Sequence, residues 1–266
     1  MGAVTEEMLQ NDLKMLGLES GDMVYVHTSM KAIGWVDGGT EALIKAFLAV
    51  LGEEGTLAVP THTLSFPGRG AAPYDSARTP TVLGAFPDAV WRHQGALRSG
   101  HGSHSSAAIG RDAAWLTENH DPTHALGKNS PLYRLWEKDG KILLLGVTHT
   151  ANTTVHLGES LAKAPYLTAH YDASWGDTVH RLAPDGSMEV HRQVEFPGCS
   201  DNFEQLEALL EARGQVKLGL VGEAPSRLIS SRDLVALVQE VLAVNPGALL
   251  CDKPGCPCCP TRKKML

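Results

Sequence analysis

The sequence predicts an α/β protein with a layered mixed sheet flanked by helices and a small antiparallel β appendage. Strand-like apolar runs alternate with helix-like segments along the 266 residues, which is the order typical of α/β folds. One run, Lys141–Leu145 (KILLL), is closed by Gly146 and indicates a buried strand. Residues 170–197 instead form short alternating stretches, which predict a β-rich insertion with a turn at Pro184-Asp185-Gly186.

The other elements follow from periodicity and from glycine and proline positions. Apolar runs predict strands at 23–27 and 56–60, and a short apolar piece spans 107–110. Helical spacing predicts helices over 4–16, 39–51, 84–93, 111–119, 202–213 and 231–244, and one that begins near 153. The Gly-, Pro- and Ser-rich stretch 61–80 is expected to be a loop. Because no interdomain linker is recognisable, we expect one domain over 1–266, with a Cys-rich tail at 251–266.

Composition limits the classes of function. A hydrophobic content of 43% without any run of eighteen apolar residues indicates a globular protein with no membrane-spanning helix. The formal net charge of -7 argues against nucleic-acid binding, which needs a basic face, and suits a cationic substrate. The N-terminal segment has an acidic amphipathic pattern and not that of a signal peptide, so we expect a cytoplasmic protein.

Four of the five cysteines lie in the segment CDKPGCPCC near the end of the chain. Cys251, Cys256, Cys258 and Cys259 can supply four thiolates to zinc, although their spacing departs from paired CxxC knuckles. A mobile, partly oxidisable tail explains them equally well, and Cys199 stands alone in the sequence. The odd total argues against a disulfide framework.

An ionisable pair follows the Lys141–Leu145 run. Residues 152–154 (Asn-Thr-Thr) suit the start of a helix, and His156 falls in its first turn. Glu159 lies three residues later on the same face. Open α/β sheets bind ligands at the carboxyl ends of their strands, so this pair is a candidate general base with its partner. On these residues alone, a capping-region histidine beside a solvated glutamate is the simpler alternative.

Two other segments combine hydrogen-bond donors with glycines. Residues 27–31 (HTSMK) end a predicted strand before a glycine-rich stretch, which suits a phosphate or an oxyanion as well as an ordinary helix start. Residues 98–106 (RSGHGSHSS) suit a polar cofactor or a plain polar loop. Neither segment contains a Walker A motif or a GxSxG nucleophile elbow.

Four blocks, in order, resemble the aminoglycoside 3-N-acetyltransferase family, antibiotic acetyltransferases unrelated to the GNAT folds. They are VHTSMKAIGWVDGG (26–39), GTLAVPTHT (55–63), RSGHGSHSSAAIG (98–110) and KILLLGVTHTANTTVHLGE (141–159). Gly127 and Ser130-Pro131-Leu132 match the family's GxxSPL element, and the resemblance covers most of residues 8–240. The chain departs from the family pattern at Gly102, where proline is usual, and in its short loop between 63 and 80.

The resemblance implies an antibiotic acetyltransferase-like fold and a resistance activity. Acetyl-CoA would donate an acetyl group directly to the 3-amino group of 2-deoxystreptamine aminoglycosides, with another small amine as the alternative acceptor. His156 would be the general base and Glu159 its partner. Neither an acyl-enzyme nor a catalytic metal is implied, and the oligomeric state is left open.

The resemblance also implies binding residues. The family's cofactor-binding stretch matches Thr28, Ser29, Met30 and Lys31, and a second cofactor contact matches His104 and Ser105. The acids expected to contact the cationic drug are Asp75, Glu159 and Asp201. At this point, either Glu159 or a distant acid such as Asp201 can be the one that orients His156.

Overall fold

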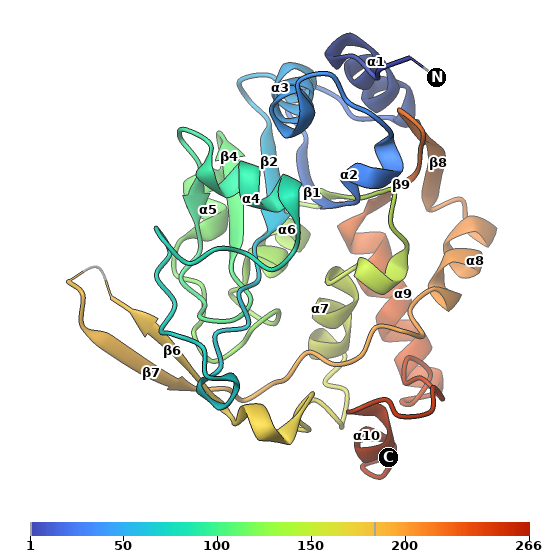
Figure 1. Ribbon diagram of the computed structural model, residues 1–266. Coiled ribbons are helices and arrows are strands. Elements are labelled where there is room, and N and C mark those ends of the chain that lie inside the picture. The colour runs from blue at the N-terminus through green and yellow to red at the C-terminus, as the bar shows by residue number, and fades with distance from the viewer. Residues whose placement is uncertain (1, 184) are drawn as a thin grey trace.

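The computed structural model contains one mixed sheet of seven strands with helices on both faces (Figure 1), which confirms the predicted α/β class. The structure describes residues 2–183 and 185–266. The strand order is β3-β4-β2-β1-β5-β9-β8. Three strands at the centre are parallel: β2 (Thr56–Pro60), β1 (Met23–Thr28) and β5 (Lys141–Leu145). The outer strands run antiparallel to their inner neighbours: β3 (Leu97–Arg98), β4 (Ser106–Gly110), β9 (Ala224–Ser230) and β8 (Val216–Val221).

The central strands are apolar on both faces because each face is covered by a helical layer. Val24 and Val26 of β1 enter one core, whereas Met23 and Tyr25 enter the other. The first face packs against α1 (Glu6–Leu16), α2 (Met30–Ile33), α3 (Gly39–Leu51) and α4 (Ala85–Arg92). The second packs against α5 (Ala113–Thr117), α6 (Pro131–Glu137), α7 (Thr154–Leu161), α8 (Gln205–Ala212) and α9 (Ser231–Val244).

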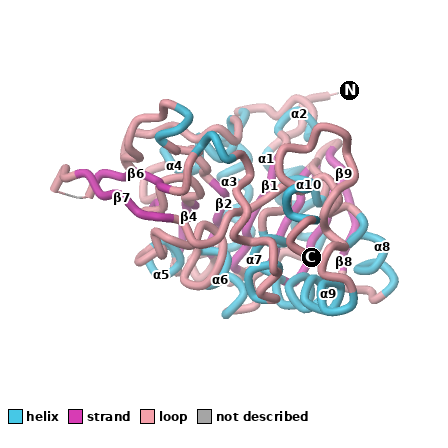
Figure 2. The backbone as a smooth tube through the Cα atoms, turned by 90° about the horizontal axis from the view of Figure 1, so that it is seen from below, coloured by secondary structure: helices cyan, strands magenta, loops and turns pink. Residues whose placement is uncertain are grey.

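The predicted β-rich insertion is an antiparallel hairpin of β6 (Thr178–Leu182) and β7 (Met188–Arg192). Figures 1 and 2 show it extending away from the sheet at one side of the molecule. Two isolated bridges join it to the rest of the chain: Tyr74 pairs with Arg181 near the turn end of β6, and His124 pairs with Glu195 just after β7. The turn expected at residues 184–186 includes Pro184, which lies outside the described residues.

Several parts of the chain differ from the sequence-based expectation. The strands β8 and β9 are missing from it, although β8 alternates apolar residues, and Pro225 interrupts the apolar pattern of β9. The helix α6 was also not expected from periodicity. The tail is packed, since Cys258 and Arg262 are buried and it ends in the helix α10 (Cys259–Lys263). Within the described residues, no helix is both long and apolar enough to span a membrane.

Gly146 ends β5 in a conformation that only glycine adopts without strain. Its φ is +69°, and a Cβ there would lie 2.4 Å from the Cβ of Ala32 in α2. Left-handed backbone strain alone costs about 1–2 kcal/mol, which corresponds to a few degrees in the melting temperature. We expect Gly146→Ala to lower the melting temperature by more than this, because the added Cβ also collides with Ala32. Gly70→Ala is the matched control, because its φ is +70° and no atom of the described residues lies within 4 Å of the added Cβ. Equal losses in thermal unfolding of the two variants would contradict the close contact.

Candidate active site

Polar side chains gather where the three parallel strands end. His27 and Thr28 lie at the end of β1, His62 follows β2, and Thr153 precedes α7 after β5. Each of these four side chains has a buried polar atom with no hydrogen-bond partner among the described residues. Unpaired buried polar atoms are rare in proteins and often mark a bound ligand or solvent. This edge of the sheet is therefore a candidate binding site.

The predicted ionisable pair forms in the first turns of α7. His156 Nδ1 lies 2.6 Å from Glu159 Oε2, and the Tyr166 hydroxyl donates to Glu159 Oε1 at 2.7 Å. His156 is 8% exposed and Glu159 only 2%, so Glu159 is not the solvated glutamate of the simpler alternative. The Phe203 ring also packs against the imidazole of His156 in an edge-to-face arrangement, with the two ring centroids 5.0 Å apart. With Nδ1 used in this way, Nε2 is the ring atom left for the cavity that His156 lines.

The helix start that places this pair differs in detail from the sequence prediction. The side-chain oxygen of Asn152 accepts the N–H of Thr154 at 3.2 Å, as expected of a capping residue. The hydroxyls of Thr153 and Thr154 find no partner in the part of the chain that the structure describes. One of the three predicted capping residues therefore has that role.

Glu159 is an ionised carboxylate in a buried position. Burial alone would raise its pKa, but the hydrogen bond from His156 and the attraction of that imidazole when it is protonated, followed by the Tyr166 hydroxyl and the charge of Arg262, bring the pKa below the usual value. Both of its oxygens already accept a hydrogen bond. Because both oxygens are already hydrogen-bonded, we expect Glu159 to orient His156 and not to make the direct drug contact that the family resemblance implied.

His156 opens onto a cavity of about 290 Å³. Part of the lining consists of three further imidazoles, those of His62, His104 and His170, and the ring centroids of His62 and His104 lie 4.5 Å apart. Aromatic rings form much of the remaining wall: Phe66, Tyr171, Trp175 and Phe196. The cavity thus combines a histidine-lined part with apolar surfaces on which a sugar ring or a cation can pack.

The imidazoles of His62 and His104 are neutral at physiological pH. Burial lowers the pKa of His104 to about 3, and repulsion from His156 and His120 when these are protonated acts in the same direction. Burial and the neighbouring His104 also hold the pKa of His62 well below its usual value. Neutral imidazoles can donate and accept hydrogen bonds without repelling a cationic substrate.

The residues expected to bind the cofactor lie at the same sheet edge, and of these residues only His104 lines the His156 cavity. Thr28 and Ser29 end β1, where the Ser29 N–H donates to the Leu145 carbonyl of β5 at 2.9 Å. Met30 and Lys31 form the first turn of α2, and Lys31 is exposed. His104 lines the cavity, whereas the hydroxyl of Ser105 is fully buried and donates to the Thr61 carbonyl at 2.7 Å. Ser105 therefore supports the loop and does not reach the cavity.

The two other acids expected to bind the drug are not among the residues that line the His156 cavity. Asp75 lines a second cavity of about 960 Å³, where it accepts the N–H of Ala77 at 2.8 Å. Asp201 forms an ion pair with Lys253 at 3.1 Å on the surface. Of the acids considered from the sequence, Glu159 is the one that contacts His156, whereas Asp201 is paired with Lys253.

Sequence reasoning missed several residues that shape the site. His62 directly follows a predicted strand, so its position at the sheet edge was available as a signal. Tyr166 and Phe203 reach His156 and Glu159 through tertiary packing, which no local pattern indicates. A second, partly buried pair was also missed: His149 Nε2 lies 2.9 Å from Glu207 Oε2, and this contact connects the loop after β5 to α8.

Comparisons with known proteins agree with the resemblance. The family model described as aminoglycoside 3-N-acetyltransferase matches residues 25–243. Aminoglycoside N(3)-acetyltransferase IV from Salmonella sp. is 34% identical over 249 residues, which cover 93% of this chain and 90% of that protein. The structure of AAC(3)-IVa, a histidine-to-alanine mutant in complex with a gentamicin, has a TM-score of 0.87 and 31% identity, with 100% of this chain and 99% of that chain covered. AAC-IIIb in a binary complex with CoASH has a TM-score of 0.78 and 26% identity, with coverage of 91% and 97%.

The neutral buried histidines predict acid sensitivity. Unfolded histidines titrate near 6.5, whereas the pKa values of His62, His101 and His104 are lowered in the folded chain. Below pH about 6.5 the unfolded chain therefore binds more protons, and the free energy of unfolding falls by about 1.4 kcal/mol per pH unit for each such histidine. Chemical unfolding at a series of pH values from neutral to about 5 measures how steeply the free energy of unfolding falls with pH. His104→Gln should reduce this slope by the contribution of one histidine, about 1.4 kcal/mol per pH unit. A stability that does not change over this window would contradict neutral histidines.

Proposed function

This chain belongs to the aminoglycoside 3-N-acetyltransferase family, and from that premise we propose that it acetylates aminoglycosides with acetyl-CoA. We place the acetyl group on the 3-amino group of the 2-deoxystreptamine ring. The observation that carries the proposal is the His156 imidazole, which is bonded to a buried carboxylate on one side and lines a cavity on the other. The complexes of two structural relatives, one with a gentamicin and one with CoASH, support both substrates.

The contact with Glu159 sets the tautomer of the proposed base. An ionised carboxylate only accepts hydrogen bonds, so His156 Nδ1 carries a proton and donates it to Glu159 Oε2. The lone pair is then on Nε2, the atom left for the cavity. A histidine held in this way is prepared to take a proton from a substrate and stays oriented while it carries the positive charge.

The transfer follows from this arrangement. The drug's amino nitrogen attacks the thioester carbonyl carbon while His156 Nε2 takes one of its protons, and a tetrahedral intermediate forms. The C–S bond then breaks, the coenzyme A thiolate leaves, and the proton on His156 returns to it. The products are an amide and free coenzyme A thiol. General base catalysis of this kind contributes about 10²- to 10⁴-fold to the rate.

Charge and shape suit the two substrates. The neutral imidazoles of His62 and His104 leave a cationic drug unrepelled, and the aromatic wall that contains Tyr171 and Trp175 offers packing surface for its rings. The net charge of -7 raises the encounter rate with a polycation. We assign the anionic cofactor to the stretch 28–31, where Lys31 is exposed beside the ends of the parallel strands.

The direct test measures thiol release from acetyl-CoA with a panel that includes gentamicin and apramycin. We expect release with at least one 2-deoxystreptamine drug and, by NMR of the product, an acetyl group on the 3-amino nitrogen. His156→Ala should lower kcat/KM by about 10²- to 10⁴-fold because the general base is lost. His191→Ala is the matched control, since His191 also bonds a glutamate, Glu189 at 2.9 Å, but does so on the β6–β7 hairpin.

Two results would contradict parts of this proposal. A His156→Ala enzyme as fast as the parent would eliminate the assigned base while leaving the substrates intact. Release of thiol with other small amines but with none of the drugs would move the acceptor to the alternative class. The drug panel is informative because this chain departs from the family pattern at Gly102 and in its short 63–80 loop, and these differences could change which amine it accepts.

A further inference from the structure

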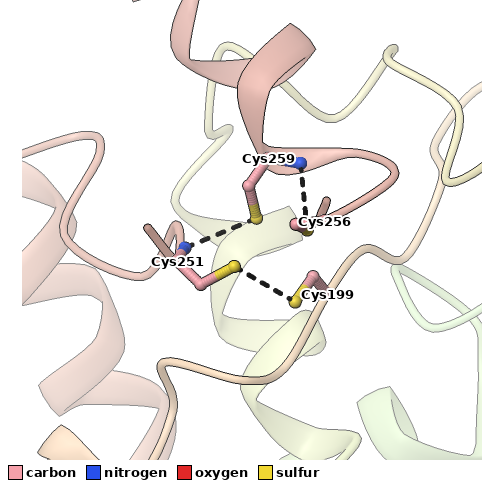
Figure 3. A group of neighbouring side chains, drawn as sticks. All are labelled: Cys199, Cys251, Cys256 and Cys259. Atoms are coloured by element: carbon pink, nitrogen blue, oxygen red, sulfur yellow. Dashed lines mark hydrogen bonds between the residues drawn. The ribbon is translucent and has the colours of Figure 1, made fainter. Parts of the chain in front are cut away.

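Four cysteine sulfurs converge at one point between two distant parts of the chain. Cys199 follows the hairpin insertion, whereas Cys251, Cys256 and Cys259 belong to the tail (Figure 3). Their Sγ atoms all lie within 4.8 Å of one another, and Cys251, Cys256 and Cys259 are buried. The structure thus removes Cys258 from the four tail cysteines considered above and recruits Cys199, which stands alone only in the sequence.

We propose that Cys199, Cys251, Cys256 and Cys259 bind one zinc ion as a tetrathiolate site. The Sγ atoms of Cys199 and Cys251 are 3.7 Å apart. Four sulfurs around zinc at bonds of about 2.3 Å form a tetrahedron whose edges are about 3.8 Å, so this separation matches. Soft thiolates in a tetrahedral arrangement select zinc or iron over calcium and magnesium.

Backbone N–H groups point at these sulfurs, as expected for anionic ligands. The N–H groups of Asp201 and Cys251 donate to the sulfurs of Cys199 and Cys259, each at 3.4 Å. The N–H of Cys259 donates to the Cys256 sulfur at 3.5 Å. Such bonds stabilise thiolate charge and fix the direction of each ligand. Each sulfur also lies close to all three others, whereas two disulfides would need only two separate pairs.

The site is structural, because thiolates occupy all four positions of the metal and leave none for a substrate. Its position explains what it stabilises. Cys199 lies between Gly198 and Ser200, which both line the His156 cavity. The tail helix α10 carries Arg262, whose guanidinium donates to the carbonyls of Phe196 and Ala169 at 2.5 and 2.9 Å. Zinc would therefore hold the tail against the wall of the cavity.

Arg262 extends this connection to the ionisable pair. Its guanidinium carbon lies 5.4 Å from the centre of the Tyr166 ring, and its charge helps to lower the pKa of Glu159. A Cβ at Gly198 would lie 2.5 Å from Arg262 Nη1, so the loop and the guanidinium are in close contact. Loss of the metal would thus loosen residues 196–200 before it affects the sheet.

The test is metal analysis of the full chain, purified without chelators from zinc-supplemented cells. We expect about one zinc per chain in the parent and in Cys258→Ser, and much less in Cys256→Ser. Cys258 is the matched control because it is also buried in the tail, but its sulfur accepts the Cys199 N–H at 3.2 Å and lies outside the group of four. Reconstitution of the apoprotein with cobalt should give the visible absorption bands of a tetrahedral thiolate complex.

A measurement on the parent protein covers the case in which Cys256→Ser does not fold. A mercurial thiol reagent should release the zinc, which a chelating dye then reports, and hydrogen exchange at residues 196–200 should increase. A zinc-free parent with freely titrating thiols, or two disulfides found by mass spectrometry, would overturn the proposal. Iron in place of zinc would overturn the identity of the metal.

Discussion

The burial of one carboxylate, that of Glu159, is the constraint on which the rest of the site depends. A charge that is 2% exposed must be paired and hydrogen-bonded, or it would destabilise the fold. Its partners come from three parts of the chain: His156 on the same helix, Tyr166 just beyond that helix, and Arg262 in the tail. The helix α7, the segment after it and the C-terminal helix must therefore all be in place before the imidazole is oriented.

The sheet and the tail each position part of the surroundings of Glu159 and His156. The three parallel strands end at one edge, and they bring His27, His62 and the start of α7 to the same side of the sheet. The loop that contains Cys199 closes the cavity from the other side, and the proposed zinc site would fix that loop to the tail. A cluster of cysteines remote in sequence from the reactive pair would thus control its surroundings without taking part in the chemistry.

The sequence was most informative where the signal is local. The central strands and α9 follow from apolar runs and helical spacing, and the contact between His156 and Glu159 follows from two residues three apart on one helix. Contacts between distant segments could not be read in this way. Tyr166, Phe203 and Arg262 reach the pair only through tertiary packing, and Cys199 joins the tail cysteines only in space. Edge strand β8 (Val216–Val221, VKLGLV) does alternate apolar residues, so it carried a local signal that the sequence prediction did not use.

The tautomer of His156 tests the central claim most directly. If the buried carboxylate of Glu159 orients the imidazole, the neutral ring carries its proton on Nδ1 and leaves Nε2 bare. Long-range ¹⁵N–¹H correlation spectra of histidine-labelled protein at neutral pH, assigned with the His156→Ala variant, distinguish the two ring nitrogens. The account predicts a protonated Nδ1 and an unprotonated Nε2 for this residue. A proton on Nε2 with a bare Nδ1 would contradict it, because no lone pair would then face the cavity.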